Sequence, residues 1–71
     1  MELEVGKYYF LHGGPHVLRI DSIGTLYASC TWIEGPRDLV GRSGEYDVPL
    51  LGSVLTPHKT YNTPLWRLLH G

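Results

Sequence analysis

The chain has 71 residues, of which 42% are hydrophobic and 18% charged, and its net charge is −1. A chain of this length forms one small domain that buries about 60% of its unfolded surface, which leaves little room for a deep catalytic cavity. The charge balance argues against a non-specific nucleic-acid binder, and the single cysteine, Cys30, excludes an intramolecular disulfide and a cysteine-rich zinc site.

Strand patterns separated by glycine and proline fill the first half of the chain. Residues 5–11 are aromatic and β-branched and predict a first strand. Gly13-Gly14-Pro15 then predicts a turn rather than a ligand loop, because the glycines tolerate positive φ and proline fixes φ near −65°. Residues 17–23 and 26–33 alternate between apolar and polar side chains. We therefore expect three consecutive antiparallel strands.

The alternation also assigns side chains to the two faces of the predicted sheet. Leu18 and Ile20 lie on the apolar side of the second strand, opposite Arg19 and Asp21. The apolar side of the third strand carries Leu26, Ala28, Cys30 and Trp32. This pattern predicts a buried, unreactive Cys30 thiol and a Trp32 side chain in the core.

The second half of the chain carries weaker signals. Residues 37–48 are compatible with a bulged strand or with a long loop around residues 41–44. Residues 49–52 predict a tight turn, and residues 53–56 a last short strand. Beyond Pro57 the chain is polar and then ends on "PLWRLLHG", where Pro64 is suited to the first position of a short helix.

Five short strands in so small a chain predict an all-β fold, a small SH3-like five-stranded barrel. We expect residues 1–56 to form this barrel. Residues 57–71 form a C-terminal extension, a short helix or strand that packs on the barrel or on a partner.

The order of the segments "VGKYYFLHGGPHVLRI", "ASCTWIEG" and "YDVPLLGSVL" resembles the YodC-like family of small bacterial proteins of unassigned function. The matching positions are Val5, Gly6, Leu11, Gly13, Gly14, Pro15, Leu18, Ile20, Cys30, Trp32, Glu34 and Gly35. The resemblance implies an SH3-like fold and almost nothing about function. One extra residue follows Pro15, so we expect a bulge near His16 or Val17. The loop after Gly35 is longer than in the family and poor in lysine, so a shared basic surface is not implied.

Catalytic and metal-binding motifs are weak in this sequence. His12 and His16 have a spacing that suits a metal site on a helix, but the glycines and proline between them prevent a helix. Ser43 lacks the Gly-x-Ser-x-Gly pattern of a nucleophile elbow. We therefore expect no catalytic residue, no metal site and no cofactor, and we predict that the protein is not an enzyme.

Arginine and aromatic side chains supply the candidate binding surface. Its predicted members are Arg37, Arg42, Arg19, Tyr27, Tyr46 and Trp66, with Lys7 and Tyr8 as further candidates. Such residues recur in protein interfaces and in sites for single-stranded nucleic acid. A nucleic-acid site requires Arg37, Arg42 and Lys7 to converge on one face.

The C-terminal extension carries four large apolar side chains, Leu65, Trp66, Leu68 and Leu69. Left in solvent, they would favour aggregation. We expect them to fold back and cap the end of the barrel. The alternative is that they dock on another subunit or on a target.

These observations predict a non-catalytic binding or regulatory module that acts through protein–protein contacts. The alternatives are a nucleic-acid-associated barrel and, second, a small metal-binding protein. The start of the chain lacks a signal-peptide pattern, and no apolar run approaches the roughly 20 residues of a membrane span. We therefore expect a cytoplasmic monomer or weak homodimer without membrane contact.

Overall fold

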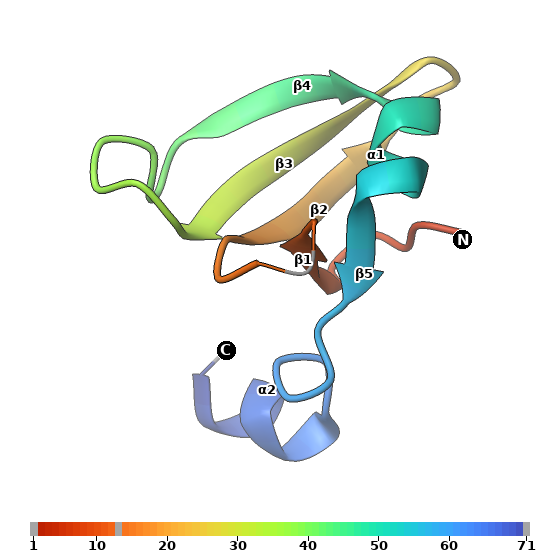
Figure 1. The fold of residues 1–71 in the computed structure, drawn as a ribbon. Helices are drawn as coiled ribbons and strands as arrows, with labels where there is room; N and C mark the ends of the chain where they lie inside the picture. Colours follow the sequence, from red (N-terminus) through yellow and green to blue (C-terminus); the bar gives the residue numbers. More distant parts are fainter. Residues whose placement is uncertain (1, 13, 71) are drawn as a thin grey trace.

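Five antiparallel strands form one sheet with the strand order β4-β3-β2-β1-β5 (Figure 1). The computed structural model describes residues 2–12 and 14–70. Its elements are β1 (Tyr8–Leu11), β2 (Val17–Ile23), β3 (Tyr27–Glu34), β4 (Ser43–Asp47), α1 (Val48–Val54), β5 (Leu55–Pro57) and α2 (Pro64–His70). The predicted run of three consecutive antiparallel strands is confirmed, and so is a helix that begins at Pro64.

The turn predicted between the first two strands is confirmed by its flanking hydrogen bonds. The amide of Leu11 donates to the carbonyl of His16 at 2.9 Å, and the amide of Gly14 donates to the carbonyl of Leu11 at 3.0 Å. Gly13 lies outside the described residues. The pairing of β2 with β3 shifts register between Val17 and Leu18, but the extra residue is Ile33, so the bulge lies on β3 and not near His16 or Val17 as expected. Val17 pairs with Phe10 and Leu18 with Tyr9, so the two neighbours still point to opposite faces of the sheet, and each is at most 2% exposed.

One face of the sheet carries the core. Its buried members are Tyr9, Leu18, Ile20, Ala28, Cys30 and Leu55 from the sheet, together with Leu51 of α1. The prediction was wrong for Leu26, which precedes β3 and is 65% exposed. Trp32 is only half-buried at the margin of this core, where its indole N–H donates to the hydroxyl of Tyr46 at 3.1 Å.

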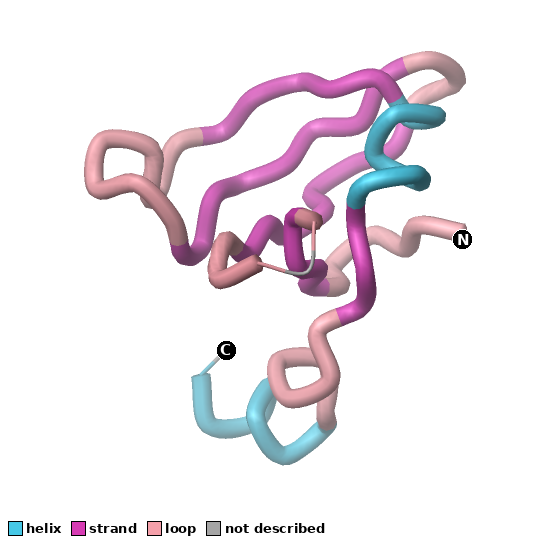
Figure 2. The backbone as a smooth tube through the Cα atoms, in the orientation of Figure 1, coloured by secondary structure: helices cyan, strands magenta, loops and turns pink. Residues whose placement is uncertain are grey.

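The prediction of a closed SH3-like barrel was wrong, because the sheet is open. Within the described residues, β4 pairs with β3 and β5 pairs with β1, but the two outer strands do not pair with each other. The expected tight turn is instead α1, which lies between the end of β4 and the start of β5 (Figures 1 and 2). Because Leu51 of this helix is buried in the core, α1 covers apolar surface that strand pairing would otherwise enclose.

Local sequence explains where α1 begins. Asp47 caps the helix, since its carboxylate accepts the amide hydrogen of Leu50 at 3.0 Å. Pro49 sits in the first turn, where its missing N–H costs no hydrogen bond. The helix then ends at Val54, so β5 begins at Leu55 and is shorter than predicted.

Cys30 is fully buried, as predicted, and its titration gives a test of the core. Burial, with a smaller effect from the charge of Asp21, raises the pKa of the thiol from 9.0 to about 11. The native state therefore keeps the thiol proton at a pH at which the unfolded chain has lost it. We expect this contribution to the free energy of unfolding to be constant below about pH 9 and to decrease as the pH rises to about 11.

Urea titrations of the wild type and of Cys30→Ala between pH 7 and 11 measure this contribution. The variant removes the thiol, so the difference between the two free energies of unfolding is expected to change above pH 9. A difference that stays constant across this range contradicts the shifted titration.

Candidate binding site

A row of side chains crosses four strands on the face of the sheet opposite the core. Tyr8 of β1 pairs with Arg19 of β2, Arg19 pairs with Thr31 of β3, and Thr31 pairs with Ser43 of β4. Side chains alternate between the two faces along a strand, so these four lie opposite their buried neighbours such as Tyr9, Leu18 and Cys30. We call this the outer face.

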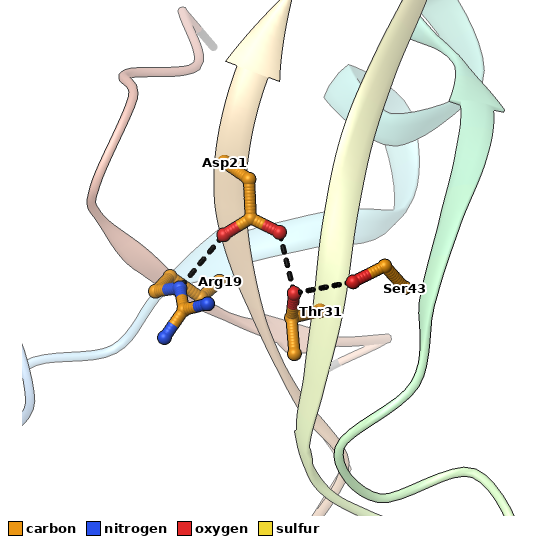
Figure 3. Close-up of polar contacts among 4 residues, drawn as sticks. All are labelled: Arg19, Asp21, Thr31 and Ser43. Carbon is orange, nitrogen blue, oxygen red and sulfur yellow. Dashed lines mark hydrogen bonds and ion pairs between the residues drawn. The ribbon is translucent and has the colours of Figure 1, made fainter.

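Polar contacts join the members of this row (Figure 3). A second register shift, between Ile20 and Ser22, leaves Asp21 as an extra residue in β2. One carboxylate oxygen of Asp21 forms an ion pair with Nε of Arg19 at 2.7 Å, and the other accepts the hydroxyl proton of Thr31. Ser43 Oγ lies 2.9 Å from Thr31 Oγ1 and is the donor of that pair, because the Thr31 proton is already used. The four side chains therefore form a continuous chain of contacts.

Asp21 restrains Arg19 through one edge of the guanidinium group only. The contact is made to Nε, and the two Nη atoms point away from Asp21 (Figure 3). The hydrogen bond to Asp21 raises the pKa of Arg19, so the side chain is charged throughout the physiological range. Tyr8 is a second hydrogen-bond partner of this side chain, and the remaining N–H donors of Arg19 lie on the outer face.

Residues 58–70, which we call the C-terminal segment, contribute four aromatic rings to a column of stacked rings that begins at Phe10 of β1. Phe10, His58, Tyr61, Trp66 and His70 follow one another, with centroids of successive rings between 3.8 and 4.4 Å apart. Tyr8 meets both Tyr61 and Trp66 edge-on, with centroids 5.7 and 5.4 Å away. This ring stack fixes α2 against β1.

Hydrogen bonds to β1 hold the same segment in place. The side-chain amide of Asn62 accepts from the amide of Tyr8 at 2.7 Å and donates to its carbonyl at 2.9 Å. The amide of Tyr61 donates to Nδ1 of the buried His58 at 3.0 Å. The Tyr61 hydroxyl donates to Glu34 at the end of β3, and this bond raises the pKa of Tyr61. The C-terminal segment is therefore tied to two strands.

An open pocket of about 200 Å³ lies where α2 meets the outer face. Its lining residues are Gly6, Tyr8, Arg19, Trp66 and Arg67. Gly6 has a φ of +84°, a conformation that favours glycine, and this lets the chain turn into β1 beside the pocket. In residues 2–12 and 14–70 the one ion pair is that of Arg19 with Asp21, so Arg67 has no carboxylate partner there.

The leucines of α2 do not cap the sheet, and the prediction was wrong for them. Leu65, Leu68 and Leu69 are 69%, 82% and 70% exposed. Only Trp66 of the apolar residues in α2 is partly buried, through the ring stack. The helix also contains Arg67 and His70 but no acidic residue. It therefore presents a surface that is both apolar and basic.

Two of the six predicted binding residues, Arg19 and Trp66, meet in this pocket. Arg37 and Arg42 are exposed in the segment between β3 and β4 and do not line it. Tyr27 is 57% exposed at the start of β3, far along the strand from Thr31. Tyr46 packs against the core, because it pairs with the buried Ala28. The predicted surface is therefore not continuous.

Arg67 and Gly6 were not among the predicted site residues. Gly6 belongs to a strand motif in the sequence, and a single glycine does not by itself indicate the positive φ found here, because glycine adopts both signs of φ. Arg67 had a stronger signal, since it follows Trp66 directly in the extension already expected to contact the sheet. Which strand it would meet depended on the path of residues 58–63.

The part of the chain that the structure describes contains no group of three histidine, cysteine or acidic side chains close enough to share a metal ion. In that same part, neither helix is long and apolar enough to cross a membrane. Comparison with protein-family models, with curated proteins and with solved structures finds no match to this chain. The resemblance to the YodC-like family therefore rests on the sequence motifs alone.

Proposed function

We propose that the protein is a non-catalytic binding module that acts through protein–protein contacts, with α2 as its contact element. The observation that carries this proposal is the exposure of Leu65, Leu68 and Leu69, each more than two thirds exposed, on a helix that the ring stack fixes to the sheet. Contiguous apolar side chains on a surface mark interaction sites. A helix already held in place also loses less conformational entropy when it binds.

The charge of α2 indicates the chemistry of the partner. The helix carries Arg67 and His70 without any acidic residue, and Arg19 lies across the pocket from it. Complementary charges across an interface favour association, and like charges oppose it. The partner we propose is a protein with an apolar patch bordered by acidic side chains. A second copy of this chain fits less well, because a symmetric contact would place two such basic surfaces against each other.

The test compares two double variants that remove exposed leucines from different places. Leu68→Ser with Leu69→Ser alters α2, whereas Leu26→Ser with Leu50→Ser alters leucines that are 65% and 55% exposed elsewhere. Each protein is immobilised and exposed to lysate of the source cells, and retained proteins are quantified by mass spectrometry. We expect at least one acidic protein to be retained by the wild type and by the control variant, and to be reduced about tenfold or more by the α2 variant.

Equal retention by both variants contradicts the proposal, and so does the absence of any retained protein. Sedimentation of the purified wild type addresses the second-copy alternative. A dimer that the α2 variant abolishes would replace the proposed partner by a second copy of the chain.

Single-stranded nucleic acid is the second candidate ligand. The pocket favours it in one respect, because guanidinium groups stand beside the rings of Tyr8 and Trp66. It ranks lower because Arg37 and Arg42 lie away from the pocket, and because a phosphate backbone offers nothing for the exposed leucines to bury against.

A further inference from the structure

We propose that the pocket lined by Gly6, Tyr8, Arg19, Trp66 and Arg67 binds the carboxylate of an acidic side chain contributed by the protein partner. This inference rests on the proposed function, and it deepens it by naming the chemical group that the site takes.

The two guanidinium groups are available to one anion. Arg19 uses Nε for Asp21, its position is fixed by that ion pair, and the N–H donors that Asp21 and Tyr8 do not use remain for a ligand (Figure 3). Arg67 has no carboxylate partner among the described residues. Two positive groups that border one small pocket repel each other, so an anion between them gains from both. The planar guanidinium fork also matches the two oxygens of a carboxylate.

The charge around the pocket favours a monoanion. Arg19 and Arg67 contribute two positive charges and Asp21 contributes one negative charge, which leaves a net charge of +1. A carboxylate neutralises this charge. A phosphate group close to the dianionic state would leave excess negative charge near Asp21, which is itself negative.

The size and walls of the pocket suit one side chain. Its volume of about 200 Å³ is smaller than the roughly 300–1,000 Å³ of pockets that hold drug-sized ligands. Tyr8 and Trp66 line the pocket beside the arginines. The methylene groups of a glutamate or aspartate side chain can pack against these rings while the carboxylate meets the guanidinium groups. The exposed Leu65 and Leu68 flank Trp66 and Arg67 in the sequence of α2. A partner segment in which an acidic residue is next to apolar residues therefore fits this site best.

Titration by nuclear magnetic resonance tests this inference with defined probes. The probe is the peptide acetyl-Leu-Glu-Glu-Leu-amide, the matched control replaces both glutamates by glutamine, and a third peptide carries phosphoserine at both positions. The indole N–H of Trp66 reports on the pocket, and that of Trp32, which is bonded to Tyr46, serves as an internal reference. We expect the glutamate peptide to shift the Trp66 signal saturably and the glutamine peptide to leave it unchanged.

Two variants identify the arginine that binds. Arg67→Gln is expected to raise the dissociation constant of the glutamate peptide about tenfold or more, because a charge-assisted hydrogen bond is lost. Arg37→Gln removes an equal charge from a site outside the pocket and is expected to leave the constant within about twofold. Absence of a Trp66 shift, equal effects of the two variants, or tighter binding of the phosphoserine peptide would each overturn the inference.

Failure of this inference can be told apart from failure of the proposed function. A partner that depends on Leu68 and Leu69 but binds Arg67→Gln as tightly as the wild type overturns the carboxylate site and leaves the function intact. Saturable binding of the glutamate peptide, with no retained protein that depends on the leucines, leaves the pocket intact and contradicts the function.

Discussion

Replacement of Ile20 by alanine is expected to lower the free energy of unfolding by about 2–5 kcal/mol. Ile20 is fully buried at the centre of the core and pairs with the equally buried Cys30. A chain of this length has a total stability of roughly 4–10 kcal/mol, so the loss is a large fraction of the whole. Equilibrium unfolding in urea, followed by circular dichroism, measures it.

Ile23→Ala is the matched control for this variant. Ile23 lies on the same strand but is 39% exposed, so its truncation removes much less buried surface. We expect a loss below about 1 kcal/mol. Equal losses in the two variants would contradict the difference in burial between Ile20 and Ile23.

Replacement of Trp66 by alanine is expected to lower the melting temperature by roughly 5–15 °C, equivalent to about 1–2 kcal/mol. Trp66 stacks on Tyr61 and His70 and meets Tyr8 edge-on, so the variant removes the contacts that fix α2 to β1. Because these contacts lie within one chain, the decrease should be the same at every protein concentration. Thermal unfolding at concentrations that differ a hundredfold measures both the size and the concentration dependence.

Leu68→Ala is the control on the same helix. Leu68 is 82% exposed, and its truncation is expected to change the melting temperature by only a few degrees. A larger decrease for Leu68→Ala than for Trp66→Ala would mean that the leucines, rather than the ring stack, hold the helix in place.

The first three strands could be predicted because their pattern is local. Alternation placed Ile20 and Cys30 on the buried face, whereas the extra residue after Pro15 did not locate the bulge, which lies at Ile33 on β3. Leu26 shows the limit of this reasoning. It continues the alternating pattern, but its position just before β3 places it outside the sheet, and so it is exposed.

Closure of the sheet could not be predicted from local pattern. Pro49 and Gly52 suggested a tight turn in residues 48–54. These residues instead form a helix, which Asp47 caps. A helix that buries Leu51 satisfies the core without pairing of β4 with β5. Sequence alone does not decide between these two ways of covering the same apolar surface.

The candidate site depends on contacts between the two ends of the chain. Tyr8 and Asn62 are 54 residues apart, yet their hydrogen bonds bring Trp66 and Arg67 beside Arg19. Composition identified arginine and aromatic residues as candidates, and Arg19 and Trp66 are in the pocket. Arg37 and Arg42 were equally plausible from composition, but the β3–β4 connection holds them elsewhere. Only the path of the C-terminal segment decides that Arg19 and Trp66 line the pocket and that Arg37 and Arg42 do not.

The bonds between Asn62 and Tyr8 also protect the protein from self-assembly. The last strand on this side of the open sheet, β5, is only three residues long and ends at Pro57, which has no N–H to offer. Beyond it the backbone of Tyr8 could pair with an extended segment from another molecule, but Asn62 bonds to both its N–H and its carbonyl, and the amide of His58 also donates to that carbonyl. At the opposite margin, β4 carries the exposed acidic residues Glu45 and Asp47, which repel a like strand. Proteolytic loss of the C-terminal segment would therefore do more than weaken the fold, since it would uncover a template for fibril growth.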